Sequence, residues 1–314
     1  MSEEEQKTDR KNLSAQVRKW VEEQGYSLEM RVAKRFQENG FAVSQFDHFV
    51  DQESHSVRPV DVVATLSEDF GNSRVAIKLF IECKYSAKDK PWVIVVTSDK
   101  FDKHAFFSRT FKGQHPSNWT KIDSLQGRLT ARMVQNIERN SALNCFLIKN
   151  PGYVVAEAFK AQGDHAYEAI MQISKCVEAH DSEAEETYKK TIQNWEPFDY
   201  QISPTHLGLF FSIAFPVVII NGQLFESYLA EDNAVEALEI ESGTVFVPYR
   251  HRETNPHSEI ILSPVIVVTE KYLDSYVILI KNAFENLLAQ TQAIQEVIQF
   301  EQSQIINPQP DDDF

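Results

Sequence analysis

The chain has 314 residues, which is enough for about two average domains. Hydrophobic residues make up 42% of the sequence and charged residues 25%, a balance that excludes a mostly disordered protein. Taken over the whole chain, the formal net charge of -15 argues against a nucleic-acid binder, because phosphate backbones attract basic surfaces.

The charge is distributed unevenly along the chain. Residues 1–150 contain 23 Lys and Arg against 20 Asp and Glu, whereas residues 151–314 contain 8 against 26. Within the first half, residues 84–149 hold 12 basic and 5 acidic residues. The excess of negative charge therefore lies in the second half, and the charge of the first half is compatible with nucleic-acid binding.

Hydrophobic spacing predicts helices and then strands in the first half. Apolar residues recur at helical spacing before Gly25 and again before Gly40, and β-branched runs separated by turn residues follow. We expect helices at 14–24 and 27–40, strands at 41–43, 60–66, 75–85 and 92–97, a basic loop at 111–120, a helix at 122–140 and a strand at 145–149.

The second half combines helices with a block of strands. Asn221-Gly222 lies between two apolar runs, which is a strong β-hairpin signal. We expect a helix at 164–180, a poorly apolar acidic stretch at 181–188, strands at 207–215, 217–220, 224–229, 245–249 and 260–268, and a long final helix capped by Thr269. The elements predict an α/β domain at 1–160, an acidic α+β accessory domain at 161–306 and a disordered acidic tail at 307–314.

Cysteine usage and hydropathy predict a soluble cytoplasmic protein. The three cysteines show neither CxxC nor zinc-ligand spacing, so a disulfide framework is not expected. The N-terminus is polar, and the longest apolar run, 207–220, is shorter than the roughly 20 residues of a membrane-spanning helix.

Three acidic residues and one lysine form a candidate catalytic set. Glu29 shares the inward face of the second expected helix, and Asp61 lies in an apolar strand. Glu82 and Lys84 point to one face of the next strand, because side chains alternate along a strand. Two neighbouring carboxylates repel each other unless a cation separates them, so Asp61 and Glu82 suit a hard metal such as Mg²⁺.

A structural role for the same residues is the alternative. Lys84 would then form a half-buried salt bridge with Glu82 or Asp61 at a sheet edge. Four ionisable groups converging in otherwise apolar strands favour a functional site, because buried charge is energetically expensive.

These residues resemble the motifs of the PD-(D/E)XK, or restriction-endonuclease-like, nuclease superfamily, and most closely those of Mrr-like restriction proteins. The matching segments are GYSLEMRVAKRF (25–36), GFAV (40–43), VDVVA (60–64) and FIECK (80–84). Val60 separates Pro59 from Asp61, so the family's "PD" doublet is not literal here. The resemblance covers about residues 20–150.

The resemblance implies an αβββαβ core with a mixed sheet, followed here by a C-terminal α+β domain. It also implies metal-dependent cleavage of phosphodiester bonds. Asp61 and Glu82 would bind the metal together with the backbone carbonyl of Cys83. Lys84 would be the catalytic lysine and Glu29 an auxiliary acid.

Basic residues near this set are candidates for nucleic-acid binding. Arg58 lies in the loop before Asp61, and two further groups follow the fourth expected strand. Those groups are Lys103, Arg109 and Lys112, between that strand and the helix expected at 122–140, and Arg128 and Arg132 on one face of that helix. A solvated charged surface is the alternative for each of them.

The sequence as a whole predicts a Mg²⁺-dependent endonuclease, with Mn²⁺ as a possible substitute. DNA is the expected substrate, in restriction, defence or repair. One alternative is a catalytically inactive nuclease fold that acts as a nucleic-acid-binding or protein-interaction scaffold, and another is an acidic protein-interaction module. We expect no membrane contact, and the C-terminal domain is the candidate surface for a homodimer or a partner protein.

Overall fold

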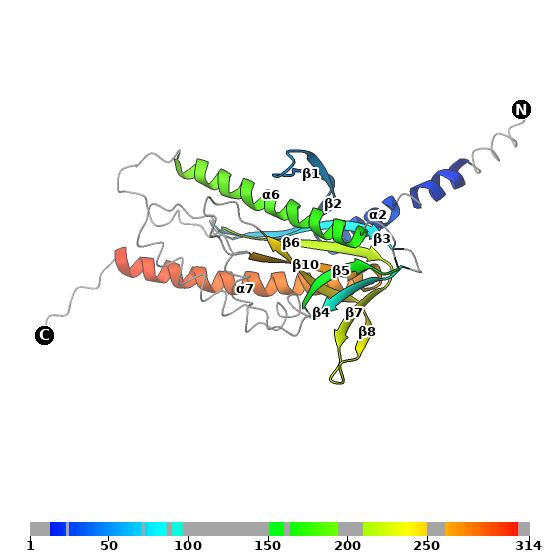
Figure 1. Cartoon of the computed structure of the whole chain (residues 1–314). Helices are drawn as coiled ribbons and strands as arrows, with labels where there is room; N and C mark the ends of the chain where they lie inside the picture. The colour runs from blue at the N-terminus through cyan, green and yellow to red at the C-terminus, as the bar shows by residue number, and fades with distance from the viewer. Residues whose placement is uncertain are drawn as a thin grey trace, which may run out of the picture.

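The computed structural model describes residues 13–22, 25–70, 73–86, 90–96, 151–159, 164–193, 210–249 and 261–306. Over these residues the protein is an α/β structure with one ten-stranded mixed sheet and helices on both of its faces (Figure 1). The α/β class and the mixed sheet predicted from the sequence are therefore confirmed.

The elements follow one another in a mixed order. A helix at residues 13–22 comes first. It is followed by α2 (Tyr26–Glu38), β1 (Ala42–Val50), β2 (Val57–Phe70), β3 (Ser73–Tyr85), β4 (Trp92–Val96), β5 (Pro151–Glu157), α6 (His165–Gln193), β6 (Phe210–Asn221), β7 (Leu224–Leu229), β8 (Val235–Ile240), β9 (Ser242–Tyr249), β10 (Ile261–Thr269), a 3₁₀ turn (Glu270–Tyr272) and α7 (Leu273–Ile306).

The strand order in the sheet is β1-β2-β3-β6-β10-β9-β5-β4-β7-β8. β1, β2 and β3 form an antiparallel meander. β6 then pairs in parallel with β3, from Arg74↔Phe210 to Tyr85↔Asn221, and β10 pairs in parallel with β6. The sheet thus includes strands from both sides of residue 160, and the expected division into two domains stays a prediction.

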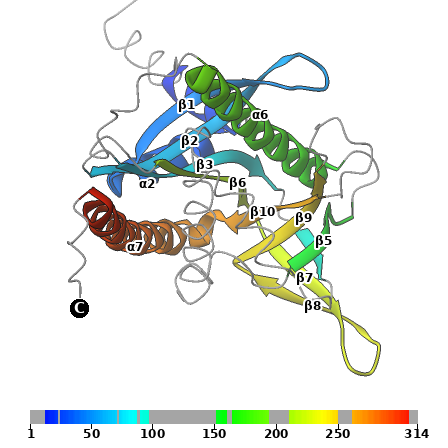
Figure 2. The same ribbon diagram turned by 90° about the vertical axis from the view of Figure 1, so that its left-hand side faces the viewer.

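Two hydrophobic cores fill the two faces of the sheet. On one face, α2 and α7 pack on the strands through residues such as Leu28, Phe36 and Ile280. On the other face, α6 packs through Ile170 and Ile173. Figure 2 shows α6 and α7 on opposite sides of the sheet, with the β7–β8 hairpin projecting away from both helices. Side chains alternate between the two cores along the strands, as period-two patterning requires.

Some local predictions differ from the structure. α6 continues through the acidic stretch at 181–188 to Gln193. Thr269 does not cap the final helix with its side chain: a 3₁₀ turn follows it, and its hydroxyl donates instead to the carbonyl of Glu241. The expected basic loop at 111–120, the helix at 122–140, the strand at 145–149 and the acidic tail at 307–314 lie outside the described residues.

Among the described helices, none has the length and hydropathy needed to cross a membrane.

Candidate active site

The candidate site lies where β2 and β3 separate. Their antiparallel ladder runs up to the pair Val62↔Ile81 and includes no pair beyond it. Residues two apart on a regular strand face the same side of the sheet. On β2, however, Val62 packs in the core under α2 and Val60 packs in the core under α6, so the alternation of side chains breaks at Asp61. On β1, which pairs with the other edge of β2, Phe46 has a left-handed φ of 58°, which is uncommon for a non-glycine residue. The backbones of β1 and β2 are therefore both irregular beside Asp61.

This irregularity turns the Asp61 carboxylate toward β3. Its Oδ2 accepts a 2.7 Å hydrogen bond from the main-chain N–H of Cys83. Burial raises the pKa of Asp61, although the Cys83 N–H and the charge of Lys84 oppose the rise. Asp61 is thus attached to the strand that carries Glu82 and Lys84.

Glu82 and Lys84 contact each other directly on β3. Lys84 Nζ lies 2.5 Å from Glu82 Oε1, and the Glu82 side chain is only 2% exposed. Oε2 of Glu82 accepts a 3.1 Å hydrogen bond from Nε2 of Gln172 on α6. Both oxygens of this carboxylate are therefore fixed by neighbouring side chains.

Glu29 approaches the same place from α2. The helix buries Leu28 and Val32 against the sheet, and Glu29 between them is close enough to Asp61 and Lys84 for their charges to act on it. Its Oε2 atom is buried and has no hydrogen-bond partner among the described residues. Burial, and then the charge of Asp61, raise the pKa of Glu29 to about 7, while Lys84 opposes the rise.

The four groups form one electrostatic cluster. Burial, and then Asp61, raise the pKa of Glu82 to about 7, with Lys84 opposing and Glu29 adding to the rise. Burial lowers the pKa of Lys84, but Glu82 and Asp61 outweigh burial and raise it. Three carboxylates and one ammonium group leave an excess of negative charge when all are ionised. Protons or a cation must compensate this excess.

The residues present fit a hard divalent cation in their chemistry. Asp61 and Glu82 offer carboxylate oxygens, the Cys83 carbonyl offers another oxygen, and Glu29 has an oxygen without a partner. Mg²⁺ usually keeps several waters and takes one or two carboxylates from the protein. Within the described ranges, however, no group of three or more His, Cys, Asp or Glu side chains is arranged to hold a metal ion.

Comparisons of this chain with protein-family models, with curated proteins and with solved structures found no match.

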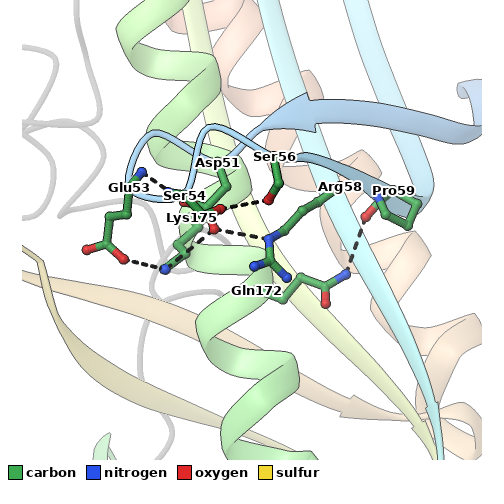
Figure 3. A network of polar contacts seen from close by, with 8 residues as sticks. All are labelled: Asp51, Glu53, Ser54, Ser56, Arg58, Pro59, Gln172 and Lys175. Carbon is green, nitrogen blue, oxygen red and sulfur yellow. Dashed lines mark hydrogen bonds and ion pairs between the residues drawn. The ribbon is translucent and has the colours of Figure 1, made fainter.

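Arg58 belongs to a polar network beside the cluster (Figure 3). Its Nε donates a 3.0 Å hydrogen bond to Oδ2 of Asp51, which is 1% exposed. Burial opposes ionisation of Asp51, yet the N–H groups of Glu53 and Ser54 and the charge of Lys175 lower its pKa to about 2. The Arg58 side chain remains 45% exposed. The other predicted nucleic-acid-binding residues, Lys103, Arg109, Lys112, Arg128 and Arg132, lie outside the described residues.

Sequence reasoning missed two contributors. Asp51 stands at the start of a loop and accepts hydrogen bonds from the N–H groups two and three residues later, which is an Asx-turn signature that could have been recognised. Gln172 is 90 positions from Glu82, and no local pattern connects them.

Proposed function

We propose that the protein is a metal-dependent endonuclease that hydrolyses phosphodiester bonds in DNA. One observation carries the proposal: Glu29, Asp61, Glu82 and Lys84 influence one another's ionisation at the point where β2 and β3 separate. A cluster of perturbed acids beside a lysine is typical of catalytic sites.

The arrangement of the elements supports the same proposal. Taken without β4 and β5, which come between β3 and α6 in the chain and lie elsewhere in the sheet, α2, β1, β2, β3, α6 and β6 follow an αβββαβ order. This is the order that the restriction-endonuclease-like resemblance implies, but α6 and β6 lie beyond residues 20–150, and the helix and strand expected at 122–140 and 145–149 lie outside the described residues. β1, β2, β3 and β6 are consecutive neighbours and form a mixed sheet. In this arrangement α2 and α6 cover opposite faces.

Asp61, Glu82 and the Cys83 carbonyl are the groups that would hold Mg²⁺ or Mn²⁺. When bound, such an ion stabilises negative charge at phosphorus and lowers the pKa of a coordinated water. Lys84 donates to Glu82, so its ammonium group would lie beside a water bound at that carboxylate and could orient it for attack. Glu29, with a pKa near neutrality, can exchange a proton with this water or with the leaving oxygen.

Arg58 supplies a contact for the substrate backbone in this scheme. Asp51 fixes the guanidinium through Nε, which leaves the terminal nitrogens to donate to a phosphate. Arg58 precedes Asp61 by three residues on β2, so the phosphate it binds would neighbour the scissile one.

A cleavage assay tests the proposal. Supercoiled plasmid, single-stranded DNA and RNA are incubated with Mg²⁺, with Mn²⁺ and with EDTA. Asp61→Asn and Lys84→Met are expected to reduce cleavage by about 100-fold or more, since each removes a charge that acts on the reacting phosphate. Lys78→Met is the matched control, because Lys78 lies on the same strand, stacks over Phe80 and is not among the charges that shift the pKa of the four groups.

Equal cleavage by the wild type and both site variants would overturn the site assignment. If no nucleic acid is cleaved and neither metal raises the unfolding temperature, the inactive scaffold is the correct alternative. DNA as substrate is contradicted if RNA alone is cut.

A further inference from the structure

The Gln172 amide connects the two strands that carry the candidate site. Its Nε2 donates to the carbonyl of Pro59 on β2 at 3.3 Å and to Oε2 of Glu82 on β3 at 3.1 Å. Figure 3 shows the first of these bonds, with Gln172 reaching from α6 to the start of β2. One amide group thus contacts both strands.

These bonds lie where the main-chain ladder is absent. The ladder between β2 and β3 stops at Val62↔Ile81, and both Pro59 and Glu82 lie beyond that pair. A main-chain carbonyl and a carboxylate can only accept hydrogen bonds, so both hydrogens of the Gln172 amide are used and its orientation is determined. The amide takes the place of ladder bonds in fixing the separation of the two strands.

The position of Gln172 is itself fixed by α6. Ile170 and Ile173 on either side are buried in the core. Three residues after Gln172, Lys175 pairs with Glu53 at 2.5 Å and with Asp51 at 3.6 Å in the loop between β1 and β2. Burial of the two isoleucines fixes the turn of α6 that carries the Gln172 amide. The Lys175 pairs are a separate connection between the helix and the loop (Figure 3).

We propose that Gln172 is a positioning residue that orients the Glu82 carboxylate for metal binding. Lys84 and Gln172 each hold one oxygen of Glu82, so the carboxylate cannot rotate to give both oxygens to Lys84. Without Gln172, such a bidentate ion pair withdraws Glu82 from the metal. This inference rests on the proposed nuclease function and adds a residue from outside the segments that resemble known nucleases.

The test compares two variants of similar shape. Gln172→Met removes both donors and keeps the length of the side chain, and Gln172→Glu replaces the donors by acceptors that repel Glu82. Binding of Mn²⁺ alone is measured by calorimetry, in the absence of DNA, on the full chain. We expect at least about 10-fold weaker Mn²⁺ binding by both variants, the usual effect of losing a residue that supports a metal ligand.

Cleavage kinetics provide a second measurement. At subsaturating Mn²⁺ the variants should lose kcat, while higher Mn²⁺ should recover much of it for Gln172→Met. KM for DNA should remain unchanged, because Gln172 is not expected to contact the substrate. A residue with a purely structural role would not give an effect that added Mn²⁺ reverses.

Lys175→Met is the matched control on the same helix. It breaks the contacts with Asp51 and Glu53 and leaves the Gln172 amide in place. It should lower the unfolding temperature and leave Mn²⁺ affinity unchanged. If it weakens Mn²⁺ binding as much as Gln172→Met, general loosening of α6 explains the effect and the inference is wrong.

The outcomes separate this inference from the proposed function. If the wild type binds Mn²⁺ and cleaves DNA, and Gln172→Met does both equally well at every Mn²⁺ concentration, the positioning role alone is overturned. If the wild type neither binds Mn²⁺ nor cleaves, the nuclease proposal and the positioning role fail together.

Discussion

The main-chain N–H of Cys83 donates a 2.7 Å hydrogen bond to Oδ2 of Asp61. This bond crosses from β3 to β2 beyond the last pair of their ladder, Val62↔Ile81. Asp61 is therefore held to the segment that contains Glu82 and Lys84, although its own strand has already left the ladder. The contact uses one oxygen and leaves Oδ1 for a metal or a water.

Asp61→Asn should separate activity from stability. The amide oxygen of asparagine can still accept the Cys83 N–H, so the strands remain connected. The lost negative charge should abolish Mg²⁺-dependent cleavage and also remove the stabilisation by added Mg²⁺. Thermal unfolding with and without Mg²⁺ measures the second effect, and a normal Mg²⁺-induced rise in the variant would contradict the assigned role.

Glu29→Gln should stabilise the protein at neutral pH when EDTA is present. The pKa of Glu29 rises from 4.5 to about 7 on folding, so the folded state binds the proton more tightly than the unfolded state does. Its ionisation therefore costs stability progressively as pH increases from about 4.5 to 7. Because the residue is only partly buried and solvent screens its charge, we expect a gain of about 1 kcal/mol at pH 8 that disappears near pH 4.5.

Urea unfolding at several pH values measures this gain. Glu231→Gln is the control, because Glu231 is exposed on the turn after β7. A constant difference between Glu29→Gln and the wild type across this range would show that ionisation of Glu29 is not its cause.

Asp51→Asn should destabilise the protein above the acidic range. The pKa of Asp51 is lowered from 3.8 to about 2 in the folded state, so its ionisation contributes stability that is present above pH 3.8 and lost as pH falls through 2. The substitution keeps the shape but removes the charge that Arg58 and Lys175 share. We expect a loss of about 1 to 2 kcal/mol at pH 7 by urea unfolding, and a smaller loss at pH 3. An equal loss at both pH values would contradict the electrostatic explanation.

Arg58→Ala should weaken binding of DNA in EDTA, where cleavage is prevented. Loss of one phosphate contact reduces the slope of log K against log salt by about 1. Arg74→Ala is the matched control, because Arg74 lies on the adjacent strand β3 and pairs with Asp69 far from the cluster. Fluorescence anisotropy at several salt concentrations measures both. Identical slopes for Arg58→Ala and the wild type would remove Arg58 from the DNA-binding surface.

The α/β class and the grouping of Glu82 with Lys84 could be predicted because both depend on local periodicity. A two-residue spacing on a strand directs Glu82 and Lys84 to one side, and helical spacing directs Glu29 inward. The break in alternation at Asp61 could not be predicted, because a side chain–main chain bond to Cys83 stabilises it.

Contacts between residues that are far apart in the chain could also not be predicted from the sequence. Nothing near β3 indicates that its parallel partner is β6, which is separated from it by more than 120 residues. The acidic stretch after residue 180 was not expected to be helical, because it lacks an apolar stripe, yet α6 continues through it. Gln172 acquires its position only through that helix.

The pairing of β3 with β6 has a consequence for synthesis of the chain. During translation, the meander β1–β2–β3 leaves the ribosome long before β6 is made. Until then, β3 has an open edge with unpaired main-chain groups over its length, which is a site for mispairing with other nascent chains. The core around the first three strands can therefore be completed only after the second half of the polypeptide is made. Protection of the open edge of β3 by a chaperone would matter most before β6 is synthesised.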